Sequence, residues 1–93
     1  MKLKYTLYHK NDIIYSYAED CSEMIEEWLK NGSLDSVETI RKEIKVGKVK
    51  LIDALKGIYG NFMLGAAEVI LQSKQLAYMP SNLNDTYIEI IEC

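Results

Sequence analysis

Histidine and cysteine are common catalytic nucleophiles and bases, and this chain contains one histidine and two cysteines. His9 stands beside a predicted turn and has no motif partner that would make it a general base. Cys21 precedes a predicted helix, but nearby carboxylates oppose a thiolate there, so we expect an inert thiol. The sequence shows no metal-ligand spacing and no glycine-rich phosphate loop after a predicted strand. We therefore predict a protein that is not an enzyme and uses no metal or cofactor.

Lysine and arginine are concentrated in the middle of the chain, where residues 41–56 hold six basic side chains against two acidic ones. The candidate nucleic-acid contacts in this segment are Arg41, Lys42, Lys45, Lys48 and Lys50. Binding to DNA depends on neutralising phosphates, and the formal net charge of −3 weakens that term. A DNA-binding regulator that uses these residues is therefore our alternative hypothesis.

Three interpretations of residues 40–55 are open. In the first, the segment resembles a helix-turn-helix, because its apolar residues fall at that motif's interior positions and Lys48 would begin a recognition helix. It departs from the motif at Arg41 and Lys45, where a small residue and a glycine are common. In the second, the segment forms two packed helices with a solvated basic face. In the third, Gly47 and Lys48 form the turn of a β-hairpin.

Acidic residues are concentrated between residues 19 and 38, which hold seven carboxylates and one lysine. A helix is expected here, beginning at a capping box over residues 20–23 and ending at Asn31 and Gly32. Its predicted buried stripe is Met24, Ile25, Trp28 and Leu29. The carboxylates of its outer side include Glu23, Glu26 and Glu27. Such an array can occupy a basic groove on a partner protein, so we take these residues as protein-interface candidates.

Residues 3–18 predict a β-hairpin, because apolar and polar residues alternate on both sides of the dipeptide Asn11-Asp12. With these two residues in the loop, Tyr8 lies opposite Tyr15, and Tyr17 shares their face. Tyrosine is enriched in protein-binding hot spots. We therefore expect the face with Tyr8, Tyr15 and Tyr17 either to bind a partner or to pack under another element.

The rest of the chain predicts more helices and one strand. A second helix begins at a Ser33 or Asp35 cap, buries Val37, Ile40 and Ile44 along one side, and ends near Gly47. A third helix spans residues 48–59, and a fourth, capped by Asn61, spans residues 61–76. Residues 79–85 form a loop by composition, and residues 86–92 form a strand that pairs with the hairpin, since an isolated hairpin is marginally stable. The predicted fold is α+β, a small antiparallel sheet packed against three to four helices.

The length of 93 residues and the hydrophobic content of 48% predict one globular domain over the whole chain. Without a long apolar run or a secretory signal, we expect a cytoplasmic protein that has no membrane partner. A domain of this size has modest stability, so a homodimer is also an expectation.

Taken together, these features predict a small non-enzymatic module that acts by occupying the surface of another protein. Its size and acidic composition are comparable to those of phage- or plasmid-type inhibitors. No motif in the sequence identifies the partner.

Overall fold

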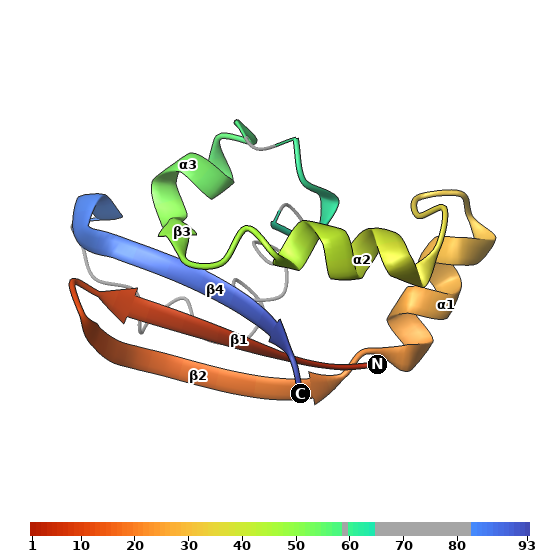
Figure 1. Cartoon of the computed structure of the whole chain (residues 1–93), viewed down its shortest axis with the longest axis horizontal. Helices are drawn as coiled ribbons and strands as arrows, with labels where there is room; N and C mark the ends of the chain where they lie inside the picture. The colour runs from red at the N-terminus through yellow and green to blue at the C-terminus, as the bar shows by residue number, and fades with distance from the viewer. Residues whose placement is uncertain (59, 65–82) are drawn as a thin grey trace.

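The structure, a computed structural model, describes residues 1–58, 60–64 and 83–93 (Figure 1). Its described elements are β1 (Lys2–His9), β2 (Asp12–Asp20), α1 (Ser22–Lys30), α2 (Val37–Ile44), β3 (Val49–Lys50), α3 (Leu51–Leu55), the 3-10 helix η2 (Leu83–Asp85) and β4 (Thr86–Glu92). The strands form a four-stranded antiparallel sheet in the order β2-β1-β4-β3. Helices α2 and α3 lie over one face of this sheet, and α1 lies at one end (Figure 1). The predicted α+β fold class is confirmed.

The two inner strands, β1 and β4, carry most of the buried residues on the core face of the sheet. The alternation of β1 turns Leu3, Tyr5 and Leu7 toward the helices, where each side chain is at most 1% exposed. On β4, Ile88 lies opposite Leu7 and Ile90 lies opposite Tyr5, so these residues extend the same apolar face. The predicted strand at residues 86–92 and its pairing with the hairpin are therefore confirmed.

The hairpin turn lies one residue earlier in the chain than the predicted loop Asn11-Asp12. The loop residues are Lys10 and Asn11, and Lys10 has a φ of 57°. The Lys10 amide donates a hydrogen bond of 2.7 Å to the Asp85 carbonyl, which ties the turn to η2. A bulge between Leu7 and Tyr8 then shifts the pairing, so that Leu7 lies opposite Tyr15. The predicted pairing of Tyr8 with Tyr15 is wrong, because a local sequence pattern does not contain this long-range contact.

Helix α1 begins one residue later than a capping box over residues 20–23 would place it. The side chain of Asp20 accepts hydrogen bonds from the amide and hydroxyl of Ser22, and these bonds lower the pKa of Asp20. Ile25 is buried as predicted, but Leu29 is 37% exposed and does not belong to the buried stripe. The helix ends before Gly32, which has a φ of 81° that glycine adopts without strain.

The segment between α2 and α3 matches none of the three interpretations in full. Helix α2 ends at Ile44, Gly47 reverses the chain with a φ of 78°, and Val49–Lys50 pairs with β4 as the edge strand β3. The hairpin interpretation is wrong, since the partner of β3 is β4. Lys48 precedes α3, so it does not begin a recognition helix. Helices α2 and α3 flank the segment, as the second interpretation expects. However, α3 begins at Leu51 and has five residues, whereas the predicted third helix spans residues 48–59.

The chain after α3 is anchored to α2 by Glu43. The Oδ1 atom of Asn61 accepts a hydrogen bond of 3.1 Å from the Leu64 amide, so the predicted cap at Asn61 is confirmed. The carboxylate of Glu43 accepts hydrogen bonds from the amides of Phe62 (3.0 Å) and Met63 (3.2 Å). These bonds satisfy amide groups that a helix start leaves without an internal partner. The remainder of the predicted helix at residues 61–76, and residues 79–82 of the predicted loop, lie outside the described residues.

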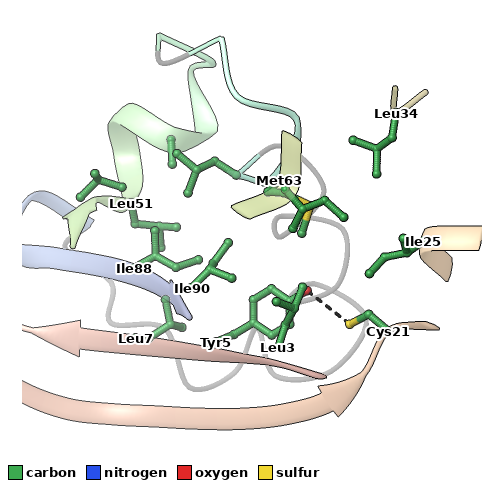
Figure 2. Packing of buried hydrophobic residues seen from close by; sticks show 14 residues of the cluster. Leu3, Tyr5, Leu7, Cys21, Ile25, Leu34, Leu51, Met63, Ile88 and Ile90 are labelled. Atoms are coloured by element: carbon green, nitrogen blue, oxygen red, sulfur yellow. Dashed lines mark hydrogen bonds between the residues drawn. The ribbon is translucent and has the colours of Figure 1, made fainter. Parts of the chain in front are cut away.

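The core lies between the sheet and the helical layer. Figure 2 shows side chains from both layers meeting there, with the Tyr5 hydroxyl directed at the Cys21 sulfur, 3.8 Å away. Trp28 and Phe62 pack edge to face at its margin, with ring centroids 4.9 Å apart. From the helical layer, the buried residues are Cys21, Ile25, Leu34, Ile40, Leu51, Ala54, Met63 and Leu64. Among the described residues, no helix has the length and apolar character needed to cross a membrane.

Candidate functional site

The three tyrosines proposed as one interface lie on different faces of the sheet. Because Tyr17 lies opposite Tyr5 and Tyr15 lies opposite Leu7, both share the core face. Their rings stack with centroids 6.4 Å apart, and both side chains are half-buried against the core. Tyr8 is on the opposite face. The prediction of a single tyrosine face is therefore wrong, and packing is the role that the structure shows for Tyr15 and Tyr17.

Tyr8 instead meets a tyrosine that the sequence did not single out. It lies opposite Tyr87 in the pairing of β1 with β4, and both side chains are half-buried. The Tyr8 hydroxyl donates a hydrogen bond of 3.0 Å to Glu89 Oε1, and this bond raises the pKa of Tyr8. Alternation in β4 already places Tyr87 and Glu89 on one face. Their meeting with Tyr8 depends on the register of β1 and β4, which local pattern does not fix.

Lys48 brings the basic middle of the sequence to these two rings. Its Nζ atom lies 4.3 Å from the centre of the Tyr8 ring and 5.2 Å from the centre of the Tyr87 ring. Both distances are within the range of a cation–π attraction. The turn at Gly47 and the pairing of Lys50 with Tyr87 hold Lys48 at this place. We call Tyr8, Tyr87 and Lys48 the tyrosine–lysine cluster.

A hollow of about 460 Å³ adjoins this cluster. It is lined by Lys10, Asn11, Lys48, Asp85 and Tyr87. The backbone hydrogen bond from Lys10 to Asp85 joins the hairpin turn to the start of β4 and so fixes the two walls. Two lysines and one aspartate line the hollow, and within the described part of the chain neither Lys10 nor Lys48 forms an ion pair. Among the lining residues that the structure describes, positive charge therefore exceeds negative charge.

The other basic candidates are spread over α2, the turn that follows it and β3. Arg41 contacts Glu38 at 2.8 Å and Glu92 at 3.0 Å. The hydrogen bonds to Glu92 and Glu38 raise the pKa of Arg41, and those from Arg41 lower the pKa of Glu92. Lys42, Lys45 and Lys50 are exposed. The basic stretch thus does not form one helix face, and its arginine is already engaged by carboxylates.

The acidic candidates lie at the end of the sheet opposite the hairpin turn (Figure 1). Glu23, Glu26 and Glu27 of α1 are exposed, as predicted. Glu26 contacts Lys30 at 3.8 Å, one turn along the helix. Opposite charges therefore gather at the two ends of the sheet, with carboxylates on α1 and lysines around the hollow.

The single histidine and the two cysteines have different environments. His9 is half-buried beside the hairpin turn, and no described group hydrogen-bonds its Nδ1 atom. Cys21 is 1% exposed, and this burial raises the pKa of its thiol, while Cys93 is exposed. Within the described ranges, no three His, Cys, Asp or Glu side chains are placed to hold a metal ion.

By its architecture, this chain is a small α+β domain with an open antiparallel sheet. Comparison with protein-family models, with curated proteins and with solved structures finds no match.

Proposed function

We propose that this protein is a non-enzymatic protein-binding module and that it contacts its partner through the tyrosine–lysine cluster. The observation that carries the proposal is the position of Lys48, whose ammonium group lies over the rings of both Tyr8 and Tyr87. Tyrosine offers a large, rigid apolar surface with a polar tip, at a low cost in conformational entropy. The hollow beside it gives the partner a concave place to fill.

Charge at the opposite end of the sheet supports the same function. Glu23, Glu26 and Glu27 project from α1 into solvent, where they attract a basic surface at long range. Surface charges of this kind chiefly raise the rate of association, whereas aromatic anchors slow dissociation. We therefore assign capture of the partner to the cluster and guidance to α1. By covering the partner's surface with both regions, the protein would inhibit that partner.

The DNA-binding alternative has weaker support. A regulator that binds DNA neutralises phosphates with several free cations on one surface. Here Arg41 is held by Glu38 and Glu92, and the remaining basic residues are spread over α2, the turn that follows it and β3. A salt series with random duplex DNA tests this alternative. Affinity at low salt that Lys48→Glu and Lys50→Glu abolish would favour it over protein binding.

The experiment for the main proposal is quantitative capture from a lysate of the producing cells. Wild-type protein and Tyr87→Ala are immobilised at equal density, and bound proteins are quantified by mass spectrometry. We expect Tyr87→Ala to reduce retention of the specific partner about tenfold or more, because a hot-spot truncation costs about 2 kcal/mol. Ile58→Ala is the control, since Ile58 is 63% exposed and belongs neither to the cluster nor to the lining of the hollow. Equal retention by Tyr87→Ala and wild type would dispose of the proposal.

A further inference from the structure

The hollow next to the tyrosine–lysine cluster has the chemistry of an anion site. It is lined by Lys10, Lys48, Asn11 and Tyr87, whose side chains carry two ammonium groups, an amide and a hydroxyl as hydrogen-bond donors. One carboxylate, that of Asp85, lines the same space. Donors therefore outnumber acidic acceptors among the lining groups. A volume of about 460 Å³ is enough for one amino-acid side chain with its adjacent backbone.

The hollow is held open by contacts that do not depend on a ligand. The backbone bond from Lys10 to Asp85 fixes the hairpin turn against η2. The ammonium nitrogen of Lys48 lies over the Tyr8 ring, and Lys50, two residues along the chain, is paired with Tyr87. A site that is already shaped loses less conformational entropy when it binds. The lysine side chains are thus positioned before a ligand binds.

A carboxylate fits these donors better than a phosphate does. Proteins commonly hold phosphate with bidentate arginine or with successive backbone amides. Arg41 is engaged by Glu38 and Glu92, and no arginine lines the hollow. The Asp85 carboxylate would repel a phosphate dianion more strongly than a singly charged carboxylate. The lysines and the amide of Asn11 match the monoanion.

We infer that the hollow binds a glutamate or aspartate side chain of an acidic segment in the partner protein, with the flanking residues of that segment lying on Tyr8 and Tyr87. This inference rests on the proposed function, since it specifies the partner's chemistry at the same surface. Lys10 and Lys48 supply the charge, and Asn11 supplies a directional hydrogen bond. The tyrosine rings accept the apolar stems beside the carboxylate.

The test uses hexaglutamate as the probe and hexaglutamine as its uncharged match, each titrated into ¹⁵N-labelled protein at constant ionic strength. We expect saturable amide shifts concentrated at Lys10, Asn11, Lys48 and Tyr87 with hexaglutamate only. Lys10→Gln and Lys48→Gln should each weaken binding about tenfold, because each removes a charge-assisted contact. Spectra of the free variants establish that they fold. Lys10→Gln keeps Lys48 in place over the Tyr8 ring, so it separates the loss of charge from damage to the cluster.

Two exposed lysines away from the hollow provide matched controls. Lys42→Gln and Lys45→Gln change the net charge by the same amount. Equal weakening by these controls would show attraction to overall charge and would overturn the inference. Absence of shifts at the hollow would overturn it as well. Larger shifts at the hollow with inorganic phosphate than with hexaglutamate would overturn the choice of a carboxylate.

A second copy of this protein could also supply carboxylates from α1. Sedimentation distinguishes binding to a second copy from binding to a different partner protein. The inference predicts that sedimentation shows no self-association that depends on the carboxylates of α1. Self-association that Glu23→Gln, Glu26→Gln and Glu27→Gln together abolish would overturn the assignment to a partner protein. The lysate experiment remains separate: loss of capture in Tyr87→Ala without hexaglutamate binding leaves the proposed function standing and removes only this inference.

Discussion

The ammonium nitrogen of Lys48 lies 4.3 Å from the centre of the Tyr8 ring. This contact joins the basic middle of the sequence to the N-terminal hairpin. Lys48 therefore contacts the sheet. In the helix-turn-helix interpretation it would instead have begun a recognition helix exposed to solvent. A cation over an aromatic face contributes about 0.5–1 kcal/mol at an exposed site.

A double-mutant cycle tests this contact. Lys48→Met keeps the length of the side chain and removes its charge, so we expect the free energy of unfolding to fall by about 0.5 kcal/mol. In a Tyr8→Leu background the same substitution should cost less, because only the more distant Tyr87 ring remains near the ammonium group. Urea denaturation of the four proteins gives the coupling energy. A cost of Lys48→Met that is unchanged by Tyr8→Leu would contradict the contact.

Glu43 should contribute more to stability than any exposed glutamate of the same helix. Its carboxylate accepts hydrogen bonds from the amides of Phe62 and Met63, and bonds to a charged acceptor are stronger than neutral ones. We expect Glu43→Gln to lower the free energy of unfolding by about 1–2 kcal/mol. Glu38→Gln is the matched control, because it removes the same charge from α2 at an exposed position, where its ion pair with Arg41 contributes little to stability. Similar losses for the two variants would argue against an anchoring role for Glu43.

Truncations in the helical layer should separate buried from exposed positions. Ile40 is 0% exposed, whereas Leu29 is 37% exposed. We expect Ile40→Ala to cost about 2–5 kcal/mol, through lost burial and the cavity that remains. Leu29→Ala should cost less than about 1 kcal/mol. Thermal and urea unfolding measure both. A larger loss for Leu29→Ala than for Ile40→Ala would contradict the buried faces that the structure gives to α1 and α2.

Alkaline pH should destabilise the protein through Tyr5 and Cys21. Burial raises the pKa of both groups, so the folded protein keeps protons that the unfolded chain releases. The stability that this provides is complete below the unfolded pKa values, near 8.5 for cysteine and 10 for tyrosine, and is lost as the pH rises above them. We expect the free energy of unfolding to fall steadily above about pH 8.5 for this reason.

The variant Tyr5→Phe isolates the tyrosine part of this effect. It removes the titrating hydroxyl and leaves the buried ring, so its stability should depend less on pH above about 10 than that of the wild type. Urea denaturation at a series of pH values measures the difference. Parallel curves for Tyr5→Phe and the wild type would show that Tyr5 does not release its proton on unfolding.

Much of the fold could be predicted from local pattern. Alternation identified the hairpin and the strand over residues 86–92, and helical spacing identified α1 and α2 with Ile25 and Ile40 on their buried sides. Asn61 was found as a cap because its side chain acts on an amide three residues away. All these features depend on neighbours within a few residues. They are the part of the structure that a single sequence encodes most directly.

The candidate site could not be predicted in the same way, because it depends on strand register. A bulge between Leu7 and Tyr8 moves Tyr15 to the core face, and nothing near these residues in the sequence marks it. Tyr87 meets Tyr8 only through the pairing of β1 with β4. The two-residue strand β3 is too short to leave a period in the sequence, yet it positions Lys48. Residues of the basic stretch and of the hairpin were both proposed, but their meeting was not.

The central claim is that the tyrosine–lysine cluster touches a partner protein, and site-specific photo-crosslinking in the producing cells tests it most directly. The photoreactive residue p-benzoylphenylalanine replaces Tyr87 in one variant and the exposed Ile58 in a second. We predict a discrete crosslinked species for the variant at position 87 that is absent for the variant at position 58, and that weakens when Lys48→Gln is added. No crosslinked species at position 87, or the same species from both positions, would contradict the claim.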